Sequence, residues 1–85
     1  MKRYFLAQVT TRDGENEYRD TFLFTKDISI SSDVLGIAGT FANKVIDRDY
    51  ANDGRDYRLY MLEDITEVCE GDYAILSKYM YVASK

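Results

Sequence analysis

Apolar positions between residues 31 and 47 recur with the spacing of an amphipathic helix. The positions i, i+4, i+7 and i+11 are occupied by Val34, Ala38, Phe41 and Val45. Three neighbours widen this apolar stripe, namely Leu35, Ala42 and Ile46. A period of 3.6 is typical of a helix that covers a core with one face. Polar side chains at Ser31, Ser32 and Asp33 can accept hydrogen bonds from first-turn amides. We therefore expect a central helix over Ser31–Asp47.

Two glycines interrupt this helical pattern. Gly36 and Gly39 lie inside the expected helix, where each costs about 1 kcal/mol relative to alanine. Close approach of the helix to a sheet would explain them, and a close contact with a partner or a phosphate is the alternative. No GxxxxGK[ST] pattern supports a phosphate-binding loop.

The N-terminal third alternates with the period of β-strands. Residues 3–11 and 17–26 are rich in aromatic and β-branched residues, and Asp13-Gly14 lies between them. This arrangement predicts a hairpin. In the second strand Tyr18, Phe22 and Phe24 share one face, which we expect to pack against the helix.

A third strand is expected over residues 57–62. Large apolar side chains occupy both of its faces, which favours a central strand or one whose second face is covered. The alternation breaks at Glu63-Asp64, where we expect a bulge or bend. Residues 71–82 fit either a fourth strand or a short helix with Asp72 as its N-cap, and the helix is favoured.

Together these elements predict an α+β fold in a single domain, residues 1–85. The expected architecture is a two-layer sandwich in the order β-β-α-β-α, with a three-stranded, mainly antiparallel sheet, one central helix and a short C-terminal helix. The composition is 46% hydrophobic and 31% charged, which is typical of a globular protein. No apolar run approaches the ~20 residues that a membrane-spanning helix needs.

Candidate chemistry is sparse. The chain has no histidine, which removes Ser-His and Cys-His nucleophilic pairs and the usual general base near neutral pH. The single Cys69 cannot form an internal disulfide and is expected to be a buried or half-buried small hydrophobe. A reducing cytoplasmic location follows from this cysteine usage. We expect a protein that is not an enzyme and that carries no cofactor or metal.

Charge is concentrated in one segment. Residues 47–72 hold nine acidic and three basic residues, a local net charge of −6, whereas residues 1–46 are balanced. Proteins that bind nucleic acids show the opposite bias, because phosphates pair with Lys and Arg. Direct binding to DNA or RNA is therefore not expected.

The acidic loop after the helix has some features of a calcium-binding loop. Its pattern Asp47-x-Asp49-x-x-x-Asp53-Gly54-x-Asp56 offers clustered carboxylates. With Gly54 at position six of an EF-hand loop, however, position three is Ala51 and position twelve is Tyr60, so two ligands fail. A solvated loop or a partner-binding surface fits this segment better.

Tyrosine is in excess, with eight in 85 residues. Such side chains supply contact area and a hydrogen bond at low entropic cost, so they are enriched in interfaces. Half-buried sheet residues, a homodimer seam and stacking on an aromatic ligand are the alternatives. The candidate partner-binding residues combine these tyrosines with the acids, and they are Asp47, Asp49, Tyr50, Asp53, Asp56, Tyr57 and Tyr60.

Two stretches resemble segments of small phage and mobile-element proteins. VTTRDGENEYRDTFLF is similar to their opening hairpin, and EDITEVCEGDYAILSKYM to their usual ending. In its small size and acidity the chain also resembles anti-CRISPR and other anti-defence proteins. That resemblance implies stoichiometric binding, in some cases with carboxylates in place of nucleic-acid phosphates.

The leading hypothesis is a non-enzymatic, phage-encoded inhibitor that blocks a host protein with a basic nucleic-acid-binding surface. The first alternative is a protein that binds or sequesters a nucleotide signal, with Arg48, Arg55 and Arg58 near Tyr57 and Tyr60. The second alternative is a homo-oligomeric structural protein.

Overall fold

A computed structural model describes residues 2–29, 33–50 and 58–83. The described residues form seven elements, which are β1 (Lys2–Asp13), β2 (Asn16–Asp27), α1 (Val34–Val45), the π-helix η1 (Ile46–Tyr50), β3 (Arg58–Val68), α2 (Glu70–Leu76) and β4 (Tyr81–Val82). The strands form one sheet in the order β3-β1-β2-β4. Neighbours are antiparallel except β4, which runs parallel to β2. The α+β class is confirmed, and the sheet is mixed and four-stranded.

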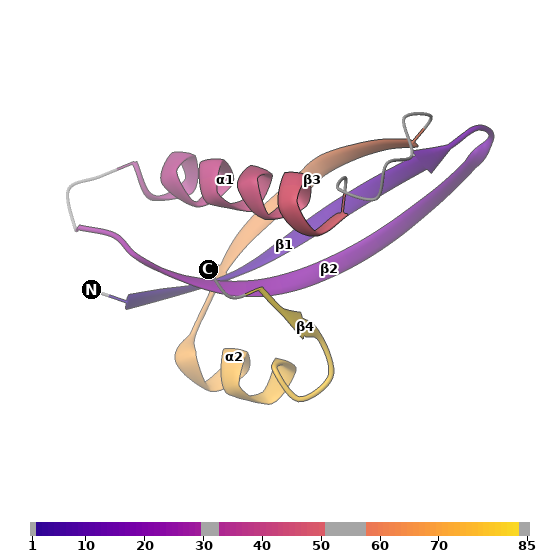
Figure 1. The fold of residues 1–85 in the computed structure, drawn as a ribbon. Helices are drawn as coiled ribbons and strands as arrows, with labels where there is room; N and C mark the ends of the chain where they lie inside the picture. Colours follow the sequence, from indigo (N-terminus) through magenta and orange to yellow (C-terminus); the bar gives the residue numbers. More distant parts are fainter. Residues whose placement is uncertain (1, 30–32, 51–57, 84–85) are drawn as a thin grey trace.

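A long hairpin of β1 and β2 forms the centre of this sheet (Figure 1). Asp13 pairs with Asn16, so the turn consists of Gly14 and Glu15. Gly14 has a φ of 64°, which an L side chain adopts only with strain. The predicted hairpin is confirmed, and both strands extend beyond their expected limits.

The main core lies between the hairpin and α1. Phe5, Phe22 and Phe24 are fully buried there, opposite small residues of the helix, Ala38 and Ala42. The expected apolar stripe of the helix is therefore largely correct. Leu35 is the exception, because it is 56% exposed.

The expectation that Tyr18 packs against the helix is wrong. Its side chain is 55% exposed, although strand alternation places it on the same face as Phe22. The hairpin continues past the end of α1 in Figure 1. Tyr18 therefore lies on the uncovered part of that face.

The third strand is an edge strand. Gln8 pairs with Asp64 and Val9 with Leu62, so Glu63 is the extra residue of a bulge, as predicted. The expectation of a central or covered strand is wrong: among the described strands β3 has only β1 as a neighbour, and Leu59 and Met61 are 59% and 44% exposed.

The C-terminal segment contains both of the structures that its sequence allows. Residues 70–76 form α2, the favoured helix, and residues 81–82 form the short strand β4 at the end of the segment for which a fourth strand was the alternative. The N-cap of α2 is Cys69 rather than Asp72, because the Cys69 sulfur accepts the Asp72 N–H at 3.4 Å. Cys69 is exposed, so its expected burial is wrong.

The two-layer prediction is also wrong. The helices α1 and α2 lie on opposite sides of the sheet (Figure 1). Tyr73 of α2 packs on Tyr4, with ring centroids 4.9 Å apart, and Tyr4 points away from the face that carries Phe5. The face of the sheet opposite α1 therefore carries a second apolar strip, which includes the buried Leu23, and α2 covers this strip.

The glycines of α1 do not serve a close helix–sheet approach. Asp33 caps the helix, and its Oδ1 accepts the Gly36 N–H at 3.2 Å. A Cβ on Gly36 would overlap the Asp33 carboxylate, whereas a Cβ on Gly39 would have no neighbour within 4 Å. Gly36 therefore makes room for the cap. Within the described residues, no helix has the length and apolar character needed to cross a membrane.

Candidate functional site

The expected helix does not end at Asp47 but continues as η1 through Tyr50. In η1 Ile46 is buried and Tyr50 half-buried, while the three residues between them are exposed. One π-helical turn thus presents Asp47, Arg48 and Asp49 to solvent and returns Tyr50 to the sheet. Such turns are rare and frequently occur at functional sites.

A row of aromatic rings positions Tyr50. Phe41 lies 5.0 Å from Phe24, Phe24 lies 5.9 Å from Phe22, and Phe22 lies 5.8 Å from Tyr50, measured between ring centroids. These separations are typical of favourable aromatic pairs. Tyr50 therefore packs against the core and is the last ring of this row, at the surface.

Asp49 is held by two partners. Its Oδ1 and Oδ2 accept from the Arg48 guanidinium at 2.6 and 2.9 Å, and Oδ2 also accepts from the Tyr81 hydroxyl at 2.8 Å. The hydrogen bonds from Arg48 and then Tyr81 lower the pKa of Asp49 from 3.8 to about 2. Asp49 is thus ionised at neutral pH and fixed in orientation.

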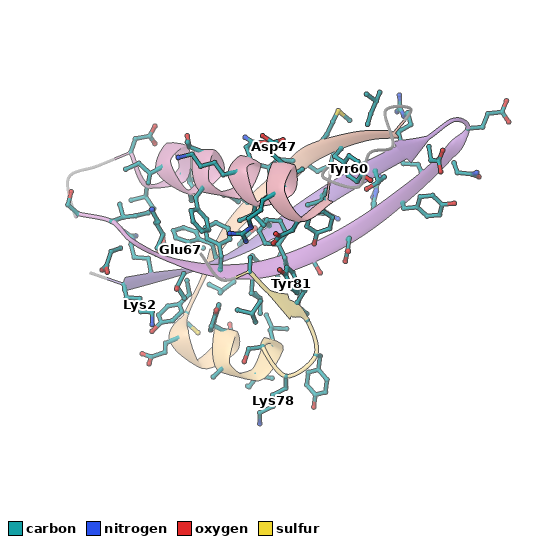
Figure 2. All side chains as sticks on the ribbon, in the orientation of Figure 1. Lys2, Asp47, Tyr60, Glu67, Lys78 and Tyr81 are labelled. Carbon is teal, nitrogen blue, oxygen red and sulfur yellow. The ribbon has the colours of Figure 1, made fainter. Side chains whose placement is uncertain are left out.

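A hollow of about 430 Å³ opens beside η1. Its walls carry three tyrosines, Tyr18, Tyr50 and Tyr60, and two carboxylates, Asp20 and Asp49. Thr11 and Arg19 complete the lining. We call it the tyrosine hollow. It combines side chains from β1, β2, η1 and β3, and Figure 2 shows Tyr60 on β3 beyond the end of α1.

Burial is the main cause that raises the pKa of Tyr50 from 10.0 to about 12. The negative charge of Asp20 adds to this effect, followed by smaller contributions from Tyr81 and Asp49. The Tyr50 hydroxyl is therefore neutral over the whole physiological range. It remains able both to donate and to accept a hydrogen bond.

Three of the seven candidate residues meet in the tyrosine hollow: Asp49, Tyr50 and Tyr60. Asp47 is exposed but does not line it, and Figure 2 shows Asp47 near the end of α1, away from Tyr81. The other three candidates lie outside the described residues, and they are Asp53, Asp56 and Tyr57.

Sequence reasoning missed Tyr18, Asp20 and Tyr81 as parts of this site. Strand alternation could have identified two of them, because Tyr18 and Asp20 share the face of Phe22. Tyr81 could not have been identified, because its position depends on the two-residue strand β4, which pairs Tyr81 with Phe22.

The charges around the hollow are unevenly paired. Arg48 binds Asp49 and Arg19 lies 3.8 Å from Glu17. By contrast, no ion pair to Asp20 or Asp47 is formed within the described residues. The bidentate contact of Arg48 with Asp49 also leaves this arginine poorly placed for an anionic ligand, which the nucleotide hypothesis needs.

A metal site is not formed by the described part of the chain, which contains no group of three or more His, Cys, Asp or Glu residues suited to hold an ion. The acidic loop considered as a calcium site falls largely on residues 51–57, outside the described ranges.

Comparisons with known proteins found no match: no family model, no curated protein and no solved structure is significantly similar to this chain.

Proposed function

We propose that the protein is a non-catalytic, phage-encoded inhibitor that covers the basic, nucleic-acid-binding surface of a host protein. The observation that carries the proposal is the position of the Asp20 carboxylate beside three tyrosines in the tyrosine hollow, with the exposed Asp47 as a second carboxylate on η1. Asp20 and Asp47 make no ion pair within the described residues, and Asp20 lines a hollow with Tyr18, Tyr50 and Tyr60.

The mechanism is stoichiometric occupation. Carboxylates at Asp20 and Asp47 take the place of nucleic-acid phosphates on an Arg/Lys surface, and the tyrosines add contact area that excludes water. Aromatic anchors beside charged groups are typical of interface hot spots. Complementary charge also speeds association, an effect that falls with ionic strength.

The experiment is competition after capture. The tagged protein is incubated with bacterial lysate, and the proteins that bind it are identified by mass spectrometry. Each captured protein is then bound to labelled DNA or RNA, and release of this nucleic acid is measured as the inhibitor is added. We expect displacement at a one-to-one ratio. The charge-reversed variant Asp20→Lys/Asp47→Lys should bind at least about tenfold more weakly, about 1.4 kcal/mol, with the largest difference at low salt.

Asp49 is left unchanged in this variant because it hydrogen-bonds Tyr81 and Arg48. The matched control is Glu15→Lys/Glu70→Lys, which reverses two exposed charges at the hairpin turn and on α2. Equal loss of binding in the control, or unchanged binding of the Asp20/Asp47 variant at low salt, contradicts the proposal.

One observation favours the homo-oligomeric alternative. Leu59 and Met61 are exposed on the edge strand β3, and unpaired edges can add a second strand. Light scattering tests this alternative, because it requires a dimer that Leu59→Lys/Met61→Lys converts to a monomer. The proposed inhibition does not depend on these two side chains and should survive the same variant.

A further inference from the structure

The tyrosine hollow has the composition of a receptor for a cation. Three tyrosines line it together with Asp20 and Asp49. Tyrosine rings attract cations through their quadrupole, and a carboxylate beside them supplies a full negative charge. At about 430 Å³ the hollow lies near the lower end of the ~300–1,000 Å³ range of ligand pockets.

The two carboxylates have different roles. The Asp49 carboxylate already accepts hydrogen bonds from Arg48 and Tyr81, so its main role is to hold this wall of the hollow in place. Asp20 accepts the Thr21 N–H on Oδ1 at 2.8 Å, and within the described residues no cation pairs with it. Asp20 is therefore the carboxylate available to an incoming positive charge.

We propose that the hollow receives one arginine side chain of the partner, an inference that rests on the proposed inhibition of a basic protein surface. A planar guanidinium can stack on tyrosine while its N–H groups bind the Asp20 carboxylate in a bidentate manner. A lysine ammonium is more strongly hydrated and lacks the planar fork. The guanidinium is also the cation that is enriched at interface hot spots.

The surroundings agree with a positively charged guest. The neutral Tyr50 hydroxyl can accept from a guanidinium N–H. Arg19, the one cation among the described lining residues, lies at 3.8 Å from Glu17, so its charge is partly balanced. An anionic ligand would instead face Asp20 and Asp49 without a free cation among the described lining residues.

The test uses small probes that do not require the partner. Nα-acetyl-arginine methylamide, its lysine counterpart and its neutral citrulline counterpart are each titrated into the protein, and the ring resonances of Tyr18, Tyr50 and Tyr60 are followed by NMR. We expect saturable shifts with the arginine probe, with a Kd in the millimolar range. The lysine probe should bind several-fold more weakly and the citrulline probe should give no saturable shift.

Two variants locate the site. Asp20→Asn keeps the acceptor for Thr21 and removes the charge, and Tyr18→Leu removes an exposed wall; each should weaken arginine binding about fivefold or more, roughly 1 kcal/mol. Glu15→Gln, an equivalent charge removal at the hairpin turn, should have no effect. The dispersion of the NMR spectrum verifies that each variant is folded.

The inference is overturned if the citrulline or lysine probe binds as tightly as the arginine probe, or if Asp20→Asn binds like the wild type. Its failure is distinguishable from that of the proposed function. No saturable binding of the arginine probe, in a protein that still displaces nucleic acid from its captured partner and loses affinity in Asp20→Lys/Asp47→Lys, contradicts the arginine receptor alone. Specific arginine binding without displacement of any nucleic acid contradicts the inhibitor function alone.

Discussion

The Tyr81 hydroxyl donates a 2.8 Å hydrogen bond to Oδ2 of Asp49, although 32 positions separate the two residues in the chain. Tyr81 lies in β4, at one edge of the sheet, and Asp49 lies in η1 at the end of α1. This bond fastens the C-terminal strand to the wall of the tyrosine hollow. The orientation of Asp49 therefore depends on a segment that is remote in sequence.

Removal of this bond should raise the pKa of Asp49. The folded-state pKa is about 2, below the usual 3.8, so ionised Asp49 stabilises the fold above about pH 4, and that stability is lost as the pH falls through 2. In Tyr81→Phe only the Arg48 partner remains, and the pKa should move toward 3.8. An NMR titration of the Asp49 carboxyl measures it, with the 82% exposed Tyr79, changed to Phe, as the control. An unchanged pKa in Tyr81→Phe would show that Arg48 alone determines it.

Tyr50 should make the fold sensitive to alkali. Its pKa is raised from 10.0 to about 12, which means that the fold favours the neutral hydroxyl. The resulting stability is complete below pH 10 and is lost as the pH rises through 12. Tyr50→Phe keeps the ring beside Phe22 and cannot ionise. Its urea midpoint should therefore fall less between pH 10 and 12 than that of the wild type.

The Asp20 charge contributes to this raised pKa, which gives an internal control. Asp20→Asn should lower the pKa of Tyr50, followed by the ultraviolet absorbance of the phenolate, whereas Glu15→Gln should leave it unchanged. Identical alkaline curves for the wild type and Tyr50→Phe would contradict the assignment of the pH effect to Tyr50.

Local periodicity carried most of the fold prediction. The alternation around Asp13-Gly14 predicts the hairpin, the 3.6 spacing predicts α1, and the break at Glu63-Asp64 predicts the bulge. Each of these features depends on residues that are close in sequence. The β4 strand depends instead on two residues that pair with Phe22 and Leu23, so the local pattern, which allows either a strand or a helix over residues 71–82, could not give its position or its pairing.

The same distinction between local and long-range contacts explains which residues of the site could be predicted from the sequence. Asp49 and Tyr50 are neighbours in an acidic, tyrosine-bearing stretch, which made them visible as candidates. The hollow also needs Tyr18 and Asp20 from β2, and their contribution depends on where α1 ends above the hairpin. A single π-helical turn determines that end, and its formation is not encoded in any simple spacing of apolar residues.

The two glycines of α1 should respond differently to alanine. Gly39→Ala meets no atom within 4 Å and should stabilise the protein by about 0.4–1 kcal/mol, since alanine is the better helix former. Gly36→Ala would collide with the Asp33 carboxylate and sacrifice the cap, a loss of about 0.5–2 kcal/mol that offsets this gain. Urea denaturation measures both variants. In an Asp33→Ala background the cap is absent, and Gly36→Ala should then become stabilising; a penalty that persists there would contradict the cap explanation.

Substitutions of Cys69 should show how much its N-cap contact contributes to the stability of the protein. Its sulfur is the N-cap acceptor for the Asp72 N–H at 3.4 Å, and sulfur is a weaker acceptor than a hydroxyl oxygen. Because Cys69 is exposed, its replacement costs little packing. Cys69→Ser should therefore exceed Cys69→Ala in stability by about 0.5–2 kcal/mol, with the wild type between them. Urea denaturation gives the order, and slower hydrogen exchange of the Asp72 amide in Cys69→Ser locates the effect at the cap. Equal stabilities of the serine and alanine variants would mean that the sulfur contact contributes nothing to α2.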